Sequence, residues 1–221
     1  MAVLETIDIE TAPQPATSII VMHGLGADGT DFVPLAQELR LEAAGAVRFV
    51  FPHAPVMPVT INGGFRMRAW YDVLGPDLRQ RQDETGLRRS LAQVEEIIER
   101  EKARGTPAGR IVLGGFSQGC ALSLLTGLRH RERLAGIVGL SGYLPLAHTT
   151  AAERSDANAL TPIFMAHGRH DDVVPMSAGE ASRDALRALG HDVEWHDYPM
   201  PHSVCMEEIQ DLNAWLLKVL A

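Results

Sequence analysis

Two patterns of apolar residues alternate along the chain. Short continuous apolar runs are typical of strands that are buried on both faces of a parallel sheet. They predict strands at residues 18–22, 47–51, 111–113, 135–140 and 162–166. A last strand is predicted at residues 193–198, where Val193 and Trp195 alternate with polar residues. Residues 3–9 instead alternate apolar and polar positions, which predicts an edge strand.

The segments between these runs carry apolar residues at helical spacing. They predict helices at residues 32–42, 84–104, 118–129 and 178–189, and an amphipathic terminal helix around residues 209–219. Strands that alternate with helices are typical of a sheet covered on both faces. The sequence therefore predicts an α/β fold with a mostly parallel sheet and helices on both faces. No segment has the composition of a linker, so residues 1–221 are predicted to form a single domain.

Residues 52–75 interrupt this alternation. The segment is rich in proline and glycine, which predicts a long loop. It also contains Phe65, Met67, Trp70 and Tyr71. Loops longer than about 15 residues in compact domains are usually functional or disordered. The four large side chains favour an ordered, functional loop.

Charge and composition exclude several classes of protein. The chain carries a net charge of −8, and an acidic chain lacks the basic surface that nucleic acids and anionic lipids attract. Its two cysteines, Cys120 and Cys205, are too few for a disulfide scaffold or a metal quartet, so neither a metal nor a cofactor is expected. A glycine-rich turn at residues 23–29 suggests a nucleotide-binding protein, but no G-x-x-x-x-G-K-[ST] motif accompanies it and we reject this alternative.

The sequence also bears on where the protein resides. No apolar run approaches the ~18 residues of a membrane-spanning helix, so no integral membrane association is expected. The first residues include Glu5, Asp8 and Glu10 rather than the basic start of a secretory signal, and they contain no cysteine for a lipid anchor. The chain is therefore predicted to be cytoplasmic. Its oligomeric state cannot be predicted.

Ser117 is the candidate nucleophile. It lies in Gly115-Phe116-Ser117-Gln118-Gly119, a G-x-S-x-G pattern between a predicted strand and a predicted helix. Such a serine occupies a sharp, strained turn that requires small neighbours and exposes its hydroxyl beside a helix N-terminus. Ser141 is the rival because it also follows a strand. It has Tyr143 where the second glycine should be, and we interpret it as a loop serine.

A nucleophilic serine needs a histidine as general base. His191, His196 and His202 all follow Ser117 in the chain. Only His202 falls in the loop between the last predicted strand and the last predicted helix. His196 lies within that strand and His191 in the turn before it, so His202 is the candidate base.

The histidine in turn needs an acid that fixes its tautomer. Asp171 and Asp172 both follow the strand at residues 162–166, and catalytic groups gather at the carboxyl ends of parallel strands. The position of these residues does not separate the two aspartates. Backbone N–H groups must also stabilise the oxyanion, and the candidates are Gln118 and the loop His23-Gly24-Leu25-Gly26.

Together these residues resemble the acyl-protein thioesterase and carboxylesterase family, which are small α/β-hydrolases without a separate cap domain. The resemblance spans nearly the whole chain. The matching segments are His23-Gly24-Leu25-Gly26-Ala27-Asp28-Gly29, Pro55 with Pro58-Val59-Thr60, Trp70-Tyr71-Asp72, Gly114-Gly115-Phe116-Ser117-Gln118-Gly119, Ser141-Gly142-Tyr143-Leu144-Pro145, His167-Gly168 with Asp171 and Val173-Val174-Pro175, and Met200 with His202.

The resemblance implies roles for particular residues. It implies a triad of Ser117, Asp171 and His202, with Asp171 preferred over Asp172, and an oxyanion hole made by the backbone amides of Leu25 and Gln118. It also implies an apolar acyl channel, whose wall would include Leu25, Leu74, Tyr143 and Val173. Cys120 departs from the small residues of relatives, and its thiol is expected to make the enzyme sensitive to thiol reagents.

The leading hypothesis is a serine carboxylesterase that cleaves acyl esters or thioesters through an acyl-enzyme. A protein S-deacylase or a lysophospholipase would use the same mechanism. The alternative outside enzymes is a catalytically inactive hydrolase fold that serves as a binding module. The retained serine, aspartate and histidine argue against that alternative.

Overall fold

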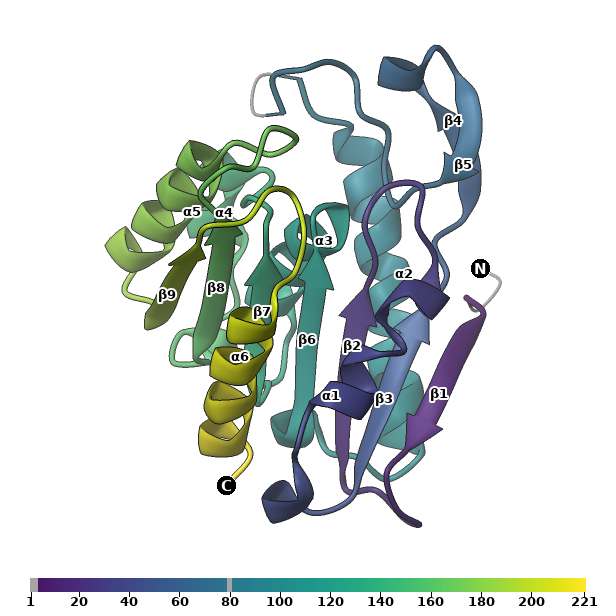
Figure 1. Ribbon diagram of the computed structural model, residues 1–221, viewed down its shortest axis with the longest axis vertical. Coiled ribbons are helices and arrows are strands. Elements are labelled where there is room, and N and C mark those ends of the chain that lie inside the picture. The colour runs from purple at the N-terminus through teal and green to yellow at the C-terminus, as the bar shows by residue number, and fades with distance from the viewer. Residues whose placement is uncertain (1–3, 79–80) are drawn as a thin grey trace.

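The computed structural model describes residues 4–78 and 81–221 of the chain and contains a seven-stranded sheet (Figure 1). The strand order is β1-β3-β2-β6-β7-β8-β9. These strands are β1 (Thr6–Glu10), β2 (Thr17–Met22), β3 (Val47–Pro52), β6 (Ile111–Phe116), β7 (Gly136–Leu140), β8 (Ile163–Gly168) and β9 (Val193–Tyr198). β1 pairs antiparallel with β3 and all other neighbours are parallel, which confirms the predicted sheet.

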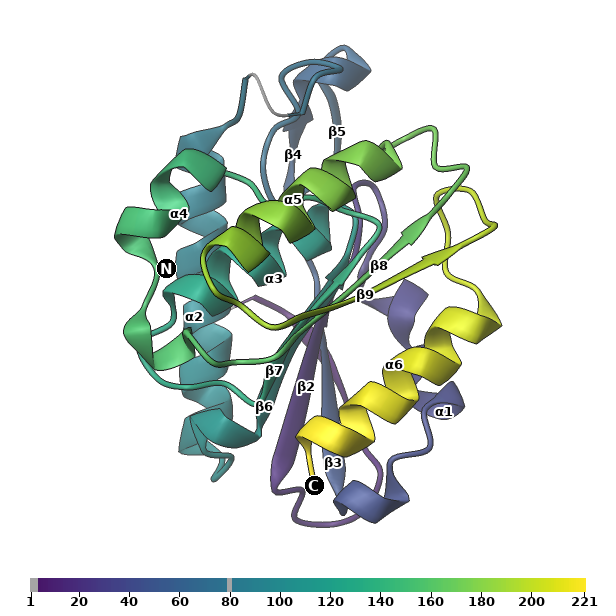
Figure 2. The ribbon, with the colours of Figure 1, turned by 90° about the vertical axis from the view of Figure 1, so that its left-hand side faces the viewer.

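Helices cover both faces of this sheet, as the sequence predicts (Figure 2). The helices are α1 (Leu35–Glu38), α2 (Glu84–Ala103), α3 (Gln118–Arg129), α4 (Ala147–Glu153), α5 (Met176–Ala188) and α6 (Met206–Val219). One apolar cluster joins α1 and α6 to one face, and two others join α2, α3 and α5 to the opposite face. The carboxyl ends of the parallel strands therefore meet at one edge between the two helical layers.

The helix predicted at residues 32–42 is largely absent. The chain forms a 3-10 helix at Gly29–Phe32, the single turn of α1, and a second 3-10 helix at Glu42–Ala44. Pro34 cannot donate a backbone hydrogen bond, and Leu39 is extended. The next backbone N–H, of Arg40, donates instead to the side chain of Asn213 in α6. Tertiary contact with α6 thus replaces the continuation of the helix.

The loop predicted at residues 52–75 contains a hairpin that the sequence pattern missed. β4 (Val56–Val59) pairs antiparallel with β5 (Phe65–Arg68), and the hairpin lies beyond the carboxyl ends of the main strands (Figure 1). Pro58 is tolerated because β4 belongs to a two-stranded sheet, where one of its edges is unpaired. Gly63 and Gly64 adopt positive φ angles and turn the chain between the two strands. The proline and glycine that indicate a loop here serve a strand and its turn.

The remaining findings concern the first strand, an unpredicted helix and membrane-spanning segments. The predicted edge strand is found as β1, although residue 3 lies outside the described residues. α4 was not predicted. In the described part of the chain, no helix is both long enough and apolar enough to span a membrane.

Glu208 in the first turn of α6 links stability to pH. Its side chain is fully buried, and this burial raises the pKa of the carboxyl group to about 8, an effect that the backbone of Cys205 offsets only in part. Between the ordinary pKa of 4.5 and this value, the folded chain holds a proton that the unfolded chain has released. Folding is therefore opposed increasingly as the pH rises.

We expect Glu208→Gln to gain stability relative to the wild type as the pH rises from about 5 to 8, by up to ~1.4 kcal/mol per pH unit. Denaturant titrations of both proteins at several pH values measure this difference in the free energy of unfolding. Glu207→Gln is the control, because Glu207 is the adjacent residue and is exposed. A difference that is independent of pH would show that Glu208 is ionised in the folded protein.

Candidate active site

Ser117 occupies the sharp turn between β6 and α3. Its φ angle is 57° and its ψ angle is −115°, a strained conformation for a residue other than glycine. The turn is crowded: a methyl group on Gly119 would overlap the carbonyl oxygen of Met22, and one on Gly115 would overlap the backbone of Gly119. The glycines on both sides of the serine are therefore required by the space around the turn, as the motif predicts.

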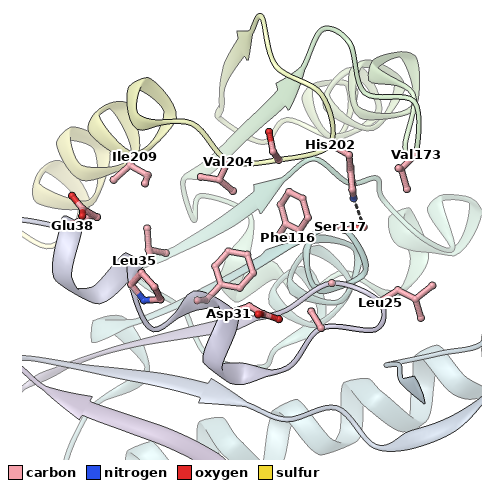
Figure 3. A pocket seen from close by; sticks show the side chains of 15 residues that line it. Leu25, Asp31, Leu35, Glu38, Phe116, Ser117, Val173, His202, Val204 and Ile209 are labelled. Atoms are coloured by element: carbon pink, nitrogen blue, oxygen red, sulfur yellow. Dashed lines mark hydrogen bonds between the residues drawn. The ribbon is translucent and has the colours of Figure 1, made fainter. Parts of the chain in front are cut away.

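His202 and Asp171 complete a chain of hydrogen bonds that begins at Ser117. Nε2 of His202 lies 2.9 Å from Oγ of Ser117 (Figure 3), and Nδ1 lies 2.7 Å from Oδ2 of Asp171. The ring of His202 also packs against Phe116, with their centroids 4.6 Å apart. Three residues from the ends of β6, β8 and β9 thus come together at one edge of the sheet. This arrangement can pass a proton from the serine to the histidine and hold the resulting imidazolium.

The structure distinguishes the two aspartates that the sequence left equivalent. Asp171 is buried, and its Oδ1 accepts hydrogen bonds from the backbone N–H groups of Val173 (2.9 Å) and Val174 (2.8 Å). These bonds orient Oδ2 toward His202. Asp172 is exposed. Asp171 is therefore the aspartate that faces the histidine.

His167 supports Asp171, a role that the sequence did not indicate although the residue lies in one of the matching segments. This buried residue donates from Nε2 to the carbonyl oxygen of Val174 (2.8 Å), and the same nitrogen lies 3.4 Å from Oδ2 of Asp171. Burial lowers the pKa of His167. A neutral ring can therefore brace the turn that holds the carboxylate. Its place at the end of β8, directly before the aspartates, was the available signal.

The loop after β2 brings a second backbone segment to the serine. A methyl group on Gly24 would lie 3.3 Å from Cβ of Ser117, so only glycine allows this close approach without adjustment. Among the described residues, nothing accepts a hydrogen bond from the N–H of Leu25. Gln118 is the first residue of α3, and the N–H of a first helical residue has no acceptor within its helix. Both groups are free to stabilise an oxyanion.

His23 fixes the shape of this loop. The backbone N–H of Ala54 donates to its Nε2 (3.0 Å), so Nδ1 carries the proton and donates to the carbonyl oxygen of Gly24 (2.7 Å). Burial lowers the pKa of His23, which favours the neutral ring that these two hydrogen bonds require. His23 thus holds the glycine beside the nucleophile.

The segment after β5 completes the hydrogen-bond network around the loop that holds Gly24 and Leu25. The side chain of Gln118 accepts from the backbone N–H of Trp70 (3.0 Å) and donates to the carbonyl oxygen of Tyr71 (2.8 Å). The indole of Trp70 donates to the carbonyl oxygen of His23 (2.9 Å). One large residue of the predicted functional loop, Trp70, therefore connects the loop after β2 with the start of α3. The sequence indicated Trp70 as part of an ordered loop but did not indicate these hydrogen bonds.

The rival residues lie in other surroundings. Ser141 has a positive φ angle like Ser117, but its buried hydroxyl has no hydrogen-bond partner among the described residues. His196 pairs with Glu194, and His191 is buried with no partner for its ring nitrogens in the described chain. Cys120 is fully buried, and burial raises the pKa of its thiol. A buried, protonated thiol is inert, so the expected sensitivity to thiol reagents is not supported at this residue.

Two cavities flank Ser117. The first, of about 510 Å³, lies between the α1 segment and α6 (Figure 3), and the second, of about 390 Å³, lies toward the segment after β5. Leu25 and Val173 line both, and Tyr143 lines the second. Leu74 lines neither, and its neighbour Val73 takes the expected place in the second cavity.

In the described chain, no group of histidine, cysteine, aspartate and glutamate side chains is arranged to hold a metal ion. The glycines at positions 24, 26 and 29 have the G-x-G-x-x-G spacing of a dinucleotide-binding turn. They lead into a four-residue 3-10 helix rather than the helix N-terminus that receives a pyrophosphate in such proteins. The turn serves the serine site instead.

The comparison with known families agrees with this geometry. The family model described as Phospholipase/Carboxylesterase matches residues 4–220, and the chain therefore belongs to this family of ester hydrolases with the α/β-hydrolase fold. Acyl-protein thioesterase 1 of Yarrowia lipolytica is 42% identical over 204 residues, which cover 90% of each chain. The homologue of the same name from Gibberella zeae is 40% identical over 218 residues, covering 95% of this chain and 93% of its own.

Solved structures give the same assignment. The crystal structure of Zea mays acyl-protein thioesterase 2 superimposes with a TM-score of 0.85 at 31% identity, covering 98% of this chain and 99% of that one. The crystal structure of Arabidopsis thaliana SOBER1 has a TM-score of 0.87 at 31% identity, with 93% and 99% coverage. The chain is thus a carboxylic ester hydrolase in fold and family.

Proposed function

We propose that the protein hydrolyses acyl thioesters and esters through an acyl-enzyme on Ser117. The observation that carries this proposal is the unbroken chain of hydrogen bonds from Oγ of Ser117 through His202 to Asp171. His202 takes the serine proton as Oγ attacks the acyl carbon. The free N–H groups of Leu25 and Gln118 stabilise the oxyanion that forms.

The second half of the cycle uses the same groups. His202 returns the proton to the departing thiol or alcohol, and the acyl group remains on Ser117. A water molecule, activated by His202, then attacks the acyl-enzyme and releases the carboxylic acid. Asp171 holds His202 in the required tautomer throughout. Every proton transfer is made by residues of this chain, so the mechanism calls for no metal or cofactor.

The second cavity suits the acyl chain. Its apolar lining adjoins Ser117 and includes Leu25, Tyr143 and Val173, three of the four residues that the resemblance implies. Gln118 lines the same cavity, so an acyl chain there would leave its carbonyl oxygen beside the proposed oxyanion hole. Relatives from several fungi carry the name acyl-protein thioesterase 1, which favours a thioester on a protein cysteine as substrate.

A matched series of oxygen esters and thioesters, with acyl chains of two to sixteen carbons, tests this function. Ser117→Ala provides the blank for each substrate. We expect turnover well above the blank, with kcat/KM highest for long-chain thioesters. A maximum at short oxygen esters would instead identify a general carboxylesterase. The absence of turnover above the blank for every substrate would favour the non-catalytic binding module.

A further inference from the structure

The two cavities beside Ser117 differ in which catalytic group they adjoin. The first is lined by His202 and the two residues that follow it, whereas the second is lined by Gln118 and not by His202. In the cycle proposed above, His202 must deliver its proton to the leaving atom. A general acid must lie within hydrogen-bond reach of the atom that it protonates. The leaving group therefore departs toward the first cavity.

The first cavity is large enough to recognise a leaving group rather than merely release it. Its volume of about 510 Å³ lies within the range of about 300–1,000 Å³ that is typical of ligand pockets. Most of the side chains that line this cavity are apolar, among them Leu35, Phe116, Val204 and Ile209 (Figure 3). A small alcohol would leave most of this surface uncovered.

The charged side chains that line this cavity are acidic. Apart from His202, the ionisable side chains that line it in the described chain are Asp31 and Glu38, and no lysine or arginine is among them. Both carboxylates are exposed, and neither forms an ion pair with another described residue. The guanidinium of the nearby Arg40 donates to the carbonyl oxygen of Gln37. Glu38 lies at the end away from Ser117 (Figure 3).

We propose that the first cavity binds the leaving group and selects one that is apolar next to the scissile bond and positively charged farther out. The acylated cysteine of a basic peptide has this chemistry. Leaving groups that carry phosphate are disfavoured, because Asp31 and Glu38 repel them. This inference rests on the proposed function, since it assumes that His202 protonates the leaving group.

The test compares cysteine peptides that carry the same S-octanoyl group and differ only in flanking residues, which are lysine, serine or glutamate. At low salt we expect kcat/KM for the lysine peptide to exceed that for the glutamate peptide by about tenfold, and this ratio to shrink as salt screens the charges. The neutral serine peptide reports thioester hydrolysis independently of charge. Initial rates are measured with Ser117→Ala as the blank.

Charge reversal separates the cavity from the field of the whole acidic protein. Glu38→Lys should largely abolish the lysine-to-glutamate ratio, whereas Glu42→Lys should largely preserve it. Glu42 is also exposed and close in sequence, but it lines neither cavity. Equal loss of the ratio in both variants would show that net charge alone is responsible and would overturn the inference.

The remaining outcomes distinguish this inference from the proposed function. Hydrolysis of all three peptides at equal rates would refute leaving-group selection while supporting thioester hydrolysis. Preference for the glutamate peptide would refute the inference and favour anionic leaving groups. If none of the peptides is hydrolysed above the blank, the proposed function itself fails.

Discussion

Ser117→Ala is expected to lower kcat for a thioester substrate by about 10⁶-fold, the scale on which loss of a triad serine acts in other hydrolases. The variant lacks the oxygen that forms the acyl-enzyme, and His202 has no proton to take from it. Stability should change little, because the hydroxyl makes its one side-chain hydrogen bond, among the described residues, to His202. Thermal unfolding and single-turnover kinetics measure the two effects.

Ser141→Ala is the matched control for this prediction. Ser141 also follows a strand and also has a positive φ angle, but its hydroxyl has no hydrogen-bond partner in the described chain. Its loss should leave turnover close to that of the wild type. Activity that survives in Ser117→Ala and disappears in Ser141→Ala would move the nucleophile to the second serine.

Asp171→Asn is expected to lower kcat by about 10⁴-fold, because an amide beside Nδ1 favours the wrong tautomer of the histidine. The isosteric side chain retains an oxygen that can accept from Val173 and Val174, so the turn should persist. Measurement of kcat at saturating substrate isolates this effect from binding.

Asp172→Asn makes the same chemical change one residue away. Asp172 is exposed and lies outside the chain of hydrogen bonds from Ser117 to Asp171. We expect this variant to retain most of its activity. A larger loss in Asp172→Asn than in Asp171→Asn would contradict the assignment of the acid.

The sequence places the candidate residues at one edge of the sheet because each of them follows a predicted strand. Ser117 and His202 each follow a predicted strand, and parallel strands carry their carboxyl ends to one edge. The choice between Asp171 and Asp172 does not follow from that rule. It depends on two backbone N–H groups that orient one carboxylate, and these depend on the local path of the chain.

The features that the sequence could not predict depend on contacts between distant segments. The helix expected at residues 32–42 does not continue to Arg40, because the backbone N–H of Arg40 donates to the side chain of Asn213, 173 positions further along the chain. The contact of Trp70 with Gln118 joins residues 48 positions apart. Local periodicity carries no information about either contact.

Covalent labelling tests the central claim most directly, namely that Ser117 is the activated nucleophile. The protein is incubated with a phosphonofluoridate, which reacts with activated serines, and the adduct is located by intact-mass measurement and peptide mapping. We predict one adduct per chain, on Ser117, with slower labelling in Asp171→Asn than in Asp172→Asn. An adduct on Ser141 or another residue, or no adduct at all, would contradict the claim.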